Sequence, residues 1–422
     1  MMLGTFLSER SFQSKTDHHW EYGVKNKKLR IAHVQPIALD IFGHRDEDWG
    51  TKVQYFLTNI AFTQARLGDQ PAVHLLTSGK PKQMELSGVR VHFHSCWQFP
   101  TSWPVTARFA RQFSFSMIKA IRKDEADVIH FHGARSLHLM HGVIAWKAHI
   151  EGIPLLSQDH GPRRGRWIEE SFRKYGSRRT DVFLAANEDS LSEFRSTGYL
   201  RNKGYIAPNG FDPKLFYPTE RSLRHTDAPF KILVVSRLWE EKDPFTMAEA
   251  VCRFAQAPHR VELTVIGQGV LRSQIEERLF RAEVPVTFKE HLSHQEIADL
   301  YRSHDVLLLT SLREGWNQVT IEAMACGLPV VASDIPGIRD GVCDAGILVP
   351  PAMPDLFAEA LTKIASNPSI ALEYRNRGLA RSRRFTWDAL MLRLRRIYLT
   401  QLDSSRDCDA QTHDEAEALE FI

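Results

Sequence analysis

The sequence has few cysteines and no long apolar run. Its 422 residues include only five cysteines, and no two of them form a CxxC pair. They are Cys96, Cys252, Cys326, Cys343 and Cys408. This odd, scattered set predicts packed thiols in a reducing compartment and argues against a disulfide framework or a zinc site. No segment approaches the roughly 18 apolar residues of a membrane-spanning helix, and we expect no signal peptide at the N-terminus.

A strong net charge is also missing. The chain has 54 Lys and Arg against 51 Asp and Glu, a formal charge of +3. The basic residues are not interleaved with a recognisable nucleic-acid-binding motif, so we expect no nucleic-acid partner. Residues 403–422 hold seven acidic residues against Arg406 alone, which gives −6 there and +9 over the remainder. We expect this tail to be solvated and disordered, and residues 1–27 to form a flexible arm.

Short apolar runs alternate with helix-like segments from Lys28 onward. The expected strands are LRIAHVQ, AVHLLTS, ADVIHFHG, PLLSQDHG and DVFLAAN in the first half, then KILVVS, VELTVIG, VTFKE, DVLLLT, LPVVAS and GILVP in the second. This alternation predicts an α/β chain with parallel sheets and right-handed crossovers. At this length we expect more than one domain, with a boundary where Pro208, Gly210 and Pro213 cluster.

Two helices are expected in the first half from the spacing of apolar residues. Residues 51–68 carry apolar side chains at helical intervals and end at Gly68, which suits a helix C-cap. Residues 106–125, TARFARQFSFSMIKAIRKDE, combine phenylalanines and isoleucines with basic residues. This second helix either packs against the core or lies on an anionic membrane surface.

The segment REGWNQVTIEAMACGLP, from Arg313 to Pro329, carries the most chemistry. Glu314 and Glu322 are separated by seven residues, between one apolar strand and the next. A strand, a glycine-containing turn and a helix N-terminus form an anion site, because unpaired N–H groups and the helix dipole point outward. A nearby carboxylate accepts hydrogen bonds from sugar hydroxyls. The combination indicates a sugar phosphate or a nucleotide sugar as ligand.

This segment resembles the E-x7-E element of the retaining glycosyltransferases of family 4. In ILVVSRLWEEKD, Arg237 and Lys242 match the family's diphosphate-binding element. The segments APNGFDPKLF, TVIGQG and FTWDALMLRLRRIY also fit, in the family's order, and the resemblance is dense from about residue 205 to 400. It implies the GT-B fold, two facing Rossmann-like domains with an interdomain cleft and a C-terminal helix that crosses back. The implied ranges are 28–207 for the acceptor-side domain, 208–383 for the nucleotide-sugar domain and 384–402 for the crossing helix.

The resemblance also implies roles for individual residues. The implied catalytic residues are Glu314, Arg237, Lys242 and His160. The implied donor-binding residues are Glu322, Gly315, Trp316, Asn317, Gly50 and Gly267, although Asn317 stands where many members carry Gly or Pro. The basic segment after His160 supplies Arg163, Arg164 and Arg166 for an anionic acceptor or a membrane surface, and a solvated helix face is the alternative.

The resulting hypothesis is a retaining transferase that needs no metal and no cofactor. Its co-substrate is a nucleoside-diphosphate sugar, with UDP or GDP as the expected nucleotide, and its acceptor is a glycan, a lipid-linked glycan or a small molecule. Histidines in HFH and HFHG are expected to be structural rather than metal ligands. We expect a cytoplasmic protein, and a peripheral contact with the inner face of the membrane is left open. An NAD-dependent dehydrogenase is disfavoured because VIGQGVLR lacks the third glycine of the dinucleotide fingerprint. A non-catalytic binding module would tolerate loss of the glutamate pair, yet both glutamates are present.

Overall fold

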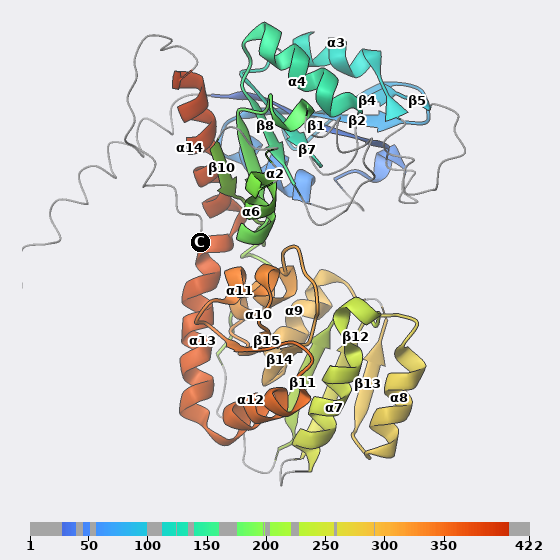
Figure 1. The fold of residues 1–422 in the computed structure, drawn as a ribbon, viewed down its shortest axis with the longest axis vertical. Helices are drawn as coiled ribbons and strands as arrows, with labels where there is room; N and C mark the ends of the chain where they lie inside the picture. The colour runs from blue at the N-terminus through green and yellow to red at the C-terminus, as the bar shows by residue number, and fades with distance from the viewer. Residues whose placement is uncertain are drawn as a thin grey trace, which may run out of the picture.

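The protein consists of two α/β domains, one above the other, with the long helix α14 alongside the upper one (Figure 1). The computed structural model describes residues 28–38, 45–50, 56–98, 112–123, 125–133, 139–159, 175–196, 198, 203–220, 228–256, 260–290 and 292–404. Each domain has its own sheet, with helices on both faces.

The N-terminal domain is built on an eight-stranded sheet in the order β10-β9-β8-β7-β1-β2-β4-β3. Its strands are β1 (Arg30–Ala38), β2 (Gln70–Thr77), β3 (Lys82–Leu86), β4 (Val89–Ser95), β7 (Val128–His132), β8 (Leu155–Gln158), β9 (Val182–Ala185) and β10 (Lys203–Ile206). All neighbours are parallel except β3 and β4. A separate two-stranded ribbon joins β5 (Trp97–Gln98) to β6 (Gln112–Phe113).

The five strands expected in the first half are confirmed, and the β3–β4 hairpin and β10 add to them. Its two-residue turn places Ser87 and Gly88 at φ +52° and +77°, and positive φ at both turn positions matches the twist of a hairpin. Alternating exposure along β3 shows why its sequence lacks the continuous apolar run that marks a fully buried parallel strand.

Four helices of this domain are described. They are α2 (Phe56–Arg66), α3 (Phe115–Lys123), α4 (Leu139–Glu151) and α6 (Glu188–Ser196). The helix expected near residues 51–68 is present as α2, and Gly68 closes it at φ +93°. The expectation of one helix over residues 106–125 is wrong at 112–114, because β6 pairs there with β5 and the helix begins only at Phe115.

The C-terminal domain has a six-stranded parallel sheet in the order β13-β12-β11-β14-β15-β16. Its strands are β11 (Phe230–Val235), β12 (Val261–Ile266), β13 (Val286–Lys289), β14 (Val306–Leu309), β15 (Val330–Ser333) and β16 (Ile347–Val349). Its helices are α7 (Pro244–Ala255), α8 (Arg272–Arg281), α9 (His294–Ser303), α10 (Gln318–Ala325), α11 (Pro336–Val342), α12 (Pro354–Ser366) and α13 (Pro368–Ser382). All six strands expected here are confirmed.

The last helix, α14 (Trp387–Ser404), crosses back to the N-terminal domain as the resemblance implies. Its apolar face packs against the first sheet in one core cluster, in which Leu394 and Ile397 join Ile31 and Val128. The chain passes between the domains twice, and the two crossing segments lie side by side. Phe211 of the first segment donates its backbone N–H to the carbonyl of Phe385 and accepts from the N–H of Trp387.

A buried ion pair fixes α14 to the first sheet. Nε of Arg395 lies 2.9 Å from a carboxylate oxygen of Asp69, and the two side chains are 5% and 0% exposed. Asp69 also accepts a hydrogen bond from the backbone N–H of Leu29. An exposed pair, Arg66 with Asp388, joins α2 to the same helix nearer its start.

We expect Asp69→Ala to lower the free energy of unfolding by about 3–5 kcal/mol, because it leaves the buried Arg395 guanidinium without this carboxylate. Asp388→Ala breaks the exposed pair between neighbouring elements and should cost no more than about 1 kcal/mol. Urea unfolding of both variants measures the difference. Equal losses would show that burial of the Arg395 pair is not what anchors the helix.

Candidate functional site

The candidate site lies at the carboxyl ends of β11 and β14. These strands are neighbours in the second sheet, so the loops that follow them meet at the same edge, where open α/β sheets bind ligands. The first loop contains Arg237 and the short 3-10 helix η5 (Glu240–Lys242), and the second contains Glu314. The first domain lies above this edge in Figure 1.

A half-buried ion pair between Lys242 and Glu314 joins the two loops. Nζ of Lys242 lies 2.7 Å from Oε1 of Glu314, with side chains 13% and 12% exposed. The same oxygen accepts from Oγ of Ser311 at 2.8 Å and from Nδ2 of Asn317 at 2.9 Å. One oxygen of the carboxylate is therefore held by three donors, and none of these hydrogen bonds uses the other oxygen.

Asn317 starts helix α10 directly beside this pair. Its side-chain oxygen accepts from the backbone N–H of Thr320 at 2.9 Å, as an N-cap does. The residue that departs from the family pattern therefore caps the helix and holds Glu314 in place. The positive end of the helix dipole and the ammonium group of Lys242 together favour an anion at this point.

The turn before α10 is tied to the segment that joins the domains. Nε1 of Trp316 donates to the carbonyl of Asn209 at 3.1 Å, and Nε2 of Gln318 donates to that of Gly210 at 2.7 Å. The Trp316 ring also lies 5.2 Å from the ring of Phe385. Movement of the interdomain segment would therefore be transmitted to the turn that carries Glu314.

Arg237 lies on the β11 loop but is not joined to Glu314. Its guanidinium pairs with Glu241 at 2.6 Å and its side chain is 65% exposed. Arg237 and Lys242 nevertheless line one small cavity together with Ser236 and Thr310. The sequence prediction placed both cations on one diphosphate, and that role stays a prediction.

Glu322 occupies the second turn of α10 in different surroundings from Glu314. The hydroxyl of Tyr301 donates to it at 3.4 Å. Burial raises the pKa of Glu322 to about 8, and the hydrogen bonds from Tyr301 and Gln318 only partly oppose this shift. The two glutamates are therefore electrostatically unlike, since one faces a cation and the other a phenol.

Two of the predicted glycines lie where a side chain cannot fit. Gly267 has φ +142°, and a Cβ there would come within 2.1 Å of the Ser236 carbonyl oxygen. The close approach seen is thus between the β12 and β11 loops, and contact with a nucleotide stays a prediction. Gly50 has φ +77°, and a Cβ would meet Leu86 at 2.5 Å.

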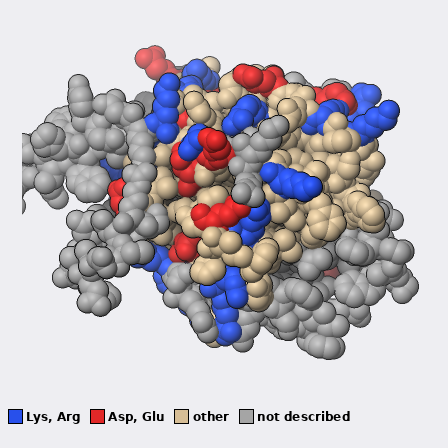
Figure 2. Space-filling model, turned by 90° about the horizontal axis from the view of Figure 1, so that it is seen from above, with Lys and Arg blue, Asp and Glu red and all other residues tan. Residues whose placement is uncertain are grey.

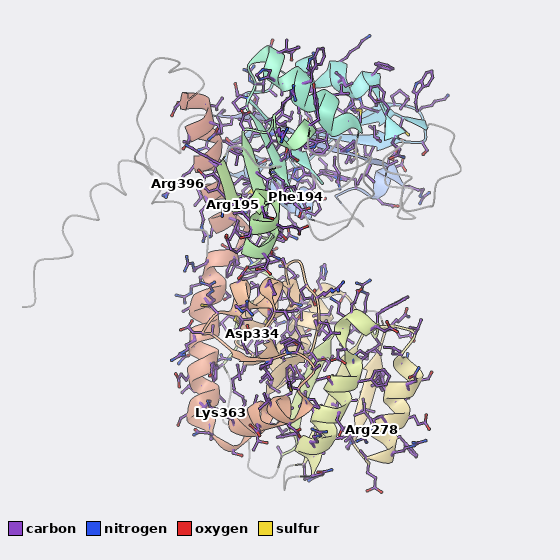
Figure 3. The ribbon with its side chains drawn as sticks, in the orientation of Figure 1. Phe194, Arg195, Arg278, Asp334, Lys363 and Arg396 are labelled. Atoms are coloured by element: carbon purple, nitrogen blue, oxygen red, sulfur yellow. The ribbon has the colours of Figure 1, made fainter. Side chains whose placement is uncertain are left out.

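The two domains touch next to the Glu314 turn through residues that sequence reasoning missed. Nδ2 of Asn187, which follows β9, donates to the carbonyl of Gly315, and the N–H of Glu188 donates to Asp340 at 3.1 Å. Figure 3 labels Phe194 and Arg195 of α6 in the upper domain and Asp334, which follows β15, in the lower one. The sequence signal that could have identified Asn187 is its place as the polar residue at the carboxyl end of the expected strand DVFLAAN.

Several predicted residues lie outside the described part of the chain. They are His160, Arg163, Arg164 and Arg166. Their neighbour Asp159 is described, is 1% exposed, and donates its backbone N–H to Leu184. The acceptor side of the site therefore stays a prediction.

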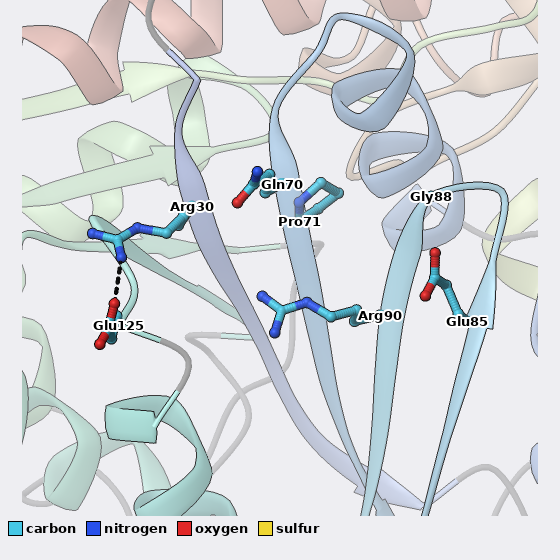
Figure 4. A pocket seen from close by; sticks show the side chains of 7 residues that line it. All are labelled: Arg30, Gln70, Pro71, Glu85, Gly88, Arg90 and Glu125. Carbon is cyan, nitrogen blue, oxygen red and sulfur yellow. Dashed lines mark hydrogen bonds and ion pairs between the residues drawn. The ribbon is translucent and has the colours of Figure 1, made fainter.

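A surface pocket of about 430 Å³ lies elsewhere, at the amino ends of β1, β2 and β4 (Figure 4). It is lined by Arg30, Gln70, Pro71, Glu85, Gly88, Arg90 and Glu125. The ion pair of Arg30 with Glu125 spans one side of it. Because ligands of such sheets bind at the carboxyl ends, this pocket is not the candidate active site.

Comparison with known proteins agrees with the resemblance. The profile of the glycosyltransferase family 4 domain matches residues 53–215, and that of glycosyl transferases group 1 matches residues 229–367. The chain belongs to the family 4 glycosyltransferases. No helix among the described residues of this glycosyltransferase is long and apolar enough to cross a membrane.

Two curated relatives have a defined chemistry in their names. A D-inositol 3-phosphate glycosyltransferase of Paenarthrobacter aurescens is 29% identical over 54% of this chain and 58% of its own length. A GDP-mannose-dependent alpha-(1-6)-phosphatidylinositol dimannoside mannosyltransferase of Mycobacterium tuberculosis is 28% identical over 64% of this chain and 72% of its own length. The match thus spans a little over half of the first relative and more of the second.

Solved structures share the fold of this family 4 chain. Sucrose-phosphate synthase of Thermosynechococcus elongatus has a TM-score of 0.67 at 20% identity, covering 89% of this chain and all of the other. Anabaena HepE in complex with UDP and glucose has a TM-score of 0.62 at 18% identity, covering 88% of this chain and all of the other. The expected GT-B architecture is confirmed.

The raised pKa of Glu322 predicts a pH-dependent stability. Between the ordinary value of 4.5 and about 8, the folded protein keeps a proton that the unfolded chain has lost. Stability should therefore fall as pH rises through this range, by at most about 1.4 kcal/mol per pH unit. Glu322→Gln should remove this contribution, so that the variant's free energy of unfolding increases relative to that of the wild type between about pH 5 and about pH 8.

Urea unfolding of the variant and the wild type at both pH values measures this change in relative stability. The matched control is Glu359→Gln, which changes an exposed glutamate of α12. A Glu322→Gln variant with the wild-type pH dependence would show that Glu322 is ionised in the folded protein.

Proposed function

We propose that the protein transfers a sugar from a nucleoside-diphosphate sugar to an acceptor hydroxyl, with retention of configuration and without a metal ion. The observation that carries this proposal is the Lys242–Glu314 pair at the N-terminus of α10. It places a cation, a helix dipole and a carboxylate at one point of the cleft edge. The cation and the helix dipole favour a diphosphate, and the carboxylate can accept hydrogen bonds from the hydroxyls of an adjacent sugar ring.

The leaving diphosphate is the group that Lys242 would stabilise. As the bond from the anomeric carbon to the phosphate oxygen breaks, negative charge grows on that oxygen, and a preorganised ammonium group favours this change. The helix dipole of α10 acts in the same direction. Arg237 pairs with the exposed Glu241, and exchanging that partner for a phosphate would add a second cation.

Glu314 would orient the sugar rather than act as an acid or a base. Lys242, Ser311 and Asn317 all donate to its Oε1, so Oε2 is the oxygen offered to a donor-sugar hydroxyl. Glu322 would accept from a ribose or sugar hydroxyl. In a retaining reaction on one face of the ring, the acceptor oxygen binds the anomeric carbon while its proton passes to the leaving phosphate, and no side-chain base is needed.

For the substrates, we propose a UDP or GDP sugar as donor and an anionic polyol, glycan or lipid-linked glycan as acceptor. The two relatives support this choice, since one name specifies GDP-mannose and both specify acceptors built on inositol and phosphate. The basic segment with Arg163, Arg164 and Arg166 would supply cations for such an acceptor.

We further propose that this protein is cytoplasmic and contacts the membrane that carries a lipid-linked acceptor. The contact would be made by the end of the N-terminal domain that α3 and α4 cover. Exposed side chains there include Trp97, Phe115, Trp146 and Ile150, at 50–70% exposure. Figure 2 shows Lys and Arg interspersed with Asp and Glu on this face. Aromatic contact with the interface region would therefore contribute more than charge.

The donor assignment is tested with Lys242→Ala. We expect UDP- or GDP-sugars to raise the melting temperature of the wild type, and the variant to lose this shift together with about 10²–10³-fold of its turnover. The matched control is Lys363→Ala, which removes an exposed lysine of α12, on the part of the lower domain that lies away from the upper one in Figure 3. Near-normal turnover in a folded Lys242→Ala protein would rule out the donor assignment.

The membrane contact is tested by sedimentation with phosphatidylglycerol vesicles. We expect the protein to sediment, and Phe115→Ser with Trp146→Ser to abolish this because the exposed aromatic surface is lost. Phe280→Ser is the control, since Phe280 is 80% exposed on α8 of the other domain. Failure of the wild type to sediment at low salt would exclude the contact.

A further inference from the structure

Two groups of three histidines lie on opposite faces of the first sheet. His33 of β1 is the register partner of His130 of β7, and His132 follows two positions later on the same face. On the other face, His74 of β2 lies 3.1 Å from His94 and stacks on His92. The sequence interpretation treated all of these histidines as structural.

The two groups differ in how their ring nitrogens are placed. One nitrogen from each of His33, His130 and His132 falls within 4.8 Å of the others, and no other such group occurs in the described part of the chain. Nδ1 of His33 lies 2.9 Å from Nε2 of His132. Nitrogens bound tetrahedrally to zinc at 2.0–2.1 Å are about 3.3 Å apart. His33 and His132 therefore already have nearly the separation of two zinc ligands, and a nitrogen of His130 lies within 4.8 Å of a nitrogen of each.

The second group does not have this arrangement. Its three rings stack nearly parallel, with interplanar angles of 11°, 13° and 6°. Its ring nitrogens do not meet the 4.8 Å limit that the first group meets. In the first group the ring of His33 is inclined by 44° to that of His130 and by 30° to that of His132, and the rings of His130 and His132 are inclined by 28° to each other.

Other side chains hold the outer nitrogens of the first group. Nε2 of His33 contacts Oε1 of Gln64 on α2 at 2.6 Å, and Nδ1 of His130 contacts the hydroxyl of Tyr398 on α14 at 2.7 Å. Gln64 also donates to Tyr398 at 3.3 Å. Metal-bound histidines show this arrangement, in which the second ring nitrogen is fixed by a carbonyl or another polar group.

The three histidines also offer a donor type that metals bind. All three are fully buried. A neutral imidazole has a lone pair to give to a metal, whereas an imidazolium has none. Neutral imidazole nitrogens suit zinc and the neighbouring divalent transition metals.

We propose that His33, His130 and His132 bind one divalent transition-metal ion of the zinc class in the core of the N-terminal domain. His33 binds it through Nδ1, His132 through Nε2 and His130 through the nitrogen that faces away from Tyr398. The ion displaces the proton between His33 and His132, so His132 carries its proton on Nδ1. Water completes the tetrahedron. The ion links β1 and β7 and, through Gln64 and Tyr398, stabilises their packing with α2 and α14.

The experiment uses full-length protein without a polyhistidine tag, stripped with a chelator and then dialysed against Zn²⁺ or Co²⁺. We expect about one ion per chain by elemental analysis and, with Co²⁺, the visible absorption of a tetrahedral site. His132→Asn should lose both signals. His94→Asn, which changes a buried histidine of the stacked group, should retain both.

Three results would overturn the proposal. The wild type could take up no ion, both variants could bind like the wild type, or both could lose the ion equally. Circular dichroism establishes that each variant is folded. If His132→Asn does not fold, anomalous diffraction at the zinc edge of wild-type crystals decides the question, because a peak between the three rings is required and its absence contradicts the site.

Discussion

The half-buried pair of Lys242 and Glu314 is the interaction on which the candidate site depends. It connects loops 72 residues apart in sequence, and it can form because β11 and β14 are neighbours in a parallel sheet. Asn317 adds the helix start of α10 to the same oxygen of Glu314. Removal of any one of the three would leave a charge or a helix end without its partner in a low-dielectric edge of the protein.

The position of the upper domain follows from a second set of contacts. Helix α14 leaves the lower domain and is held on the first sheet by apolar packing and by the buried pair of Arg395 and Asp69. Asn187 then donates to Gly315, one residue from Glu314. The turn that carries Glu314 in the lower domain therefore contacts the upper domain directly, and Asn187 is the residue that links the two.

Strands were easier to predict than helices and loops. Buried parallel strands such as β11 and β14 are continuous apolar runs, and a local pattern of this kind survives in any tertiary setting. The β3–β4 hairpin was missed because β3 alternates in exposure at the sheet edge. The helix expected over residues 106–125 was too long because pairing of Phe113 with Trp97 overrides local helical spacing. Propensity is a weak signal wherever a strand partner is available.

The sequence by itself determined the buried parallel strands, the E-x7-E spacing of Glu314 and Glu322, and the family. Each of these is written in residues that are close together in the chain. Only the tertiary structure decided that Lys242 faces Glu314 while Arg237 pairs with Glu241, and that three histidines from two strands converge in the core. These outcomes depend on which strands become neighbours and on the twist and register of their pairing, and no local period in a sequence encodes those distances.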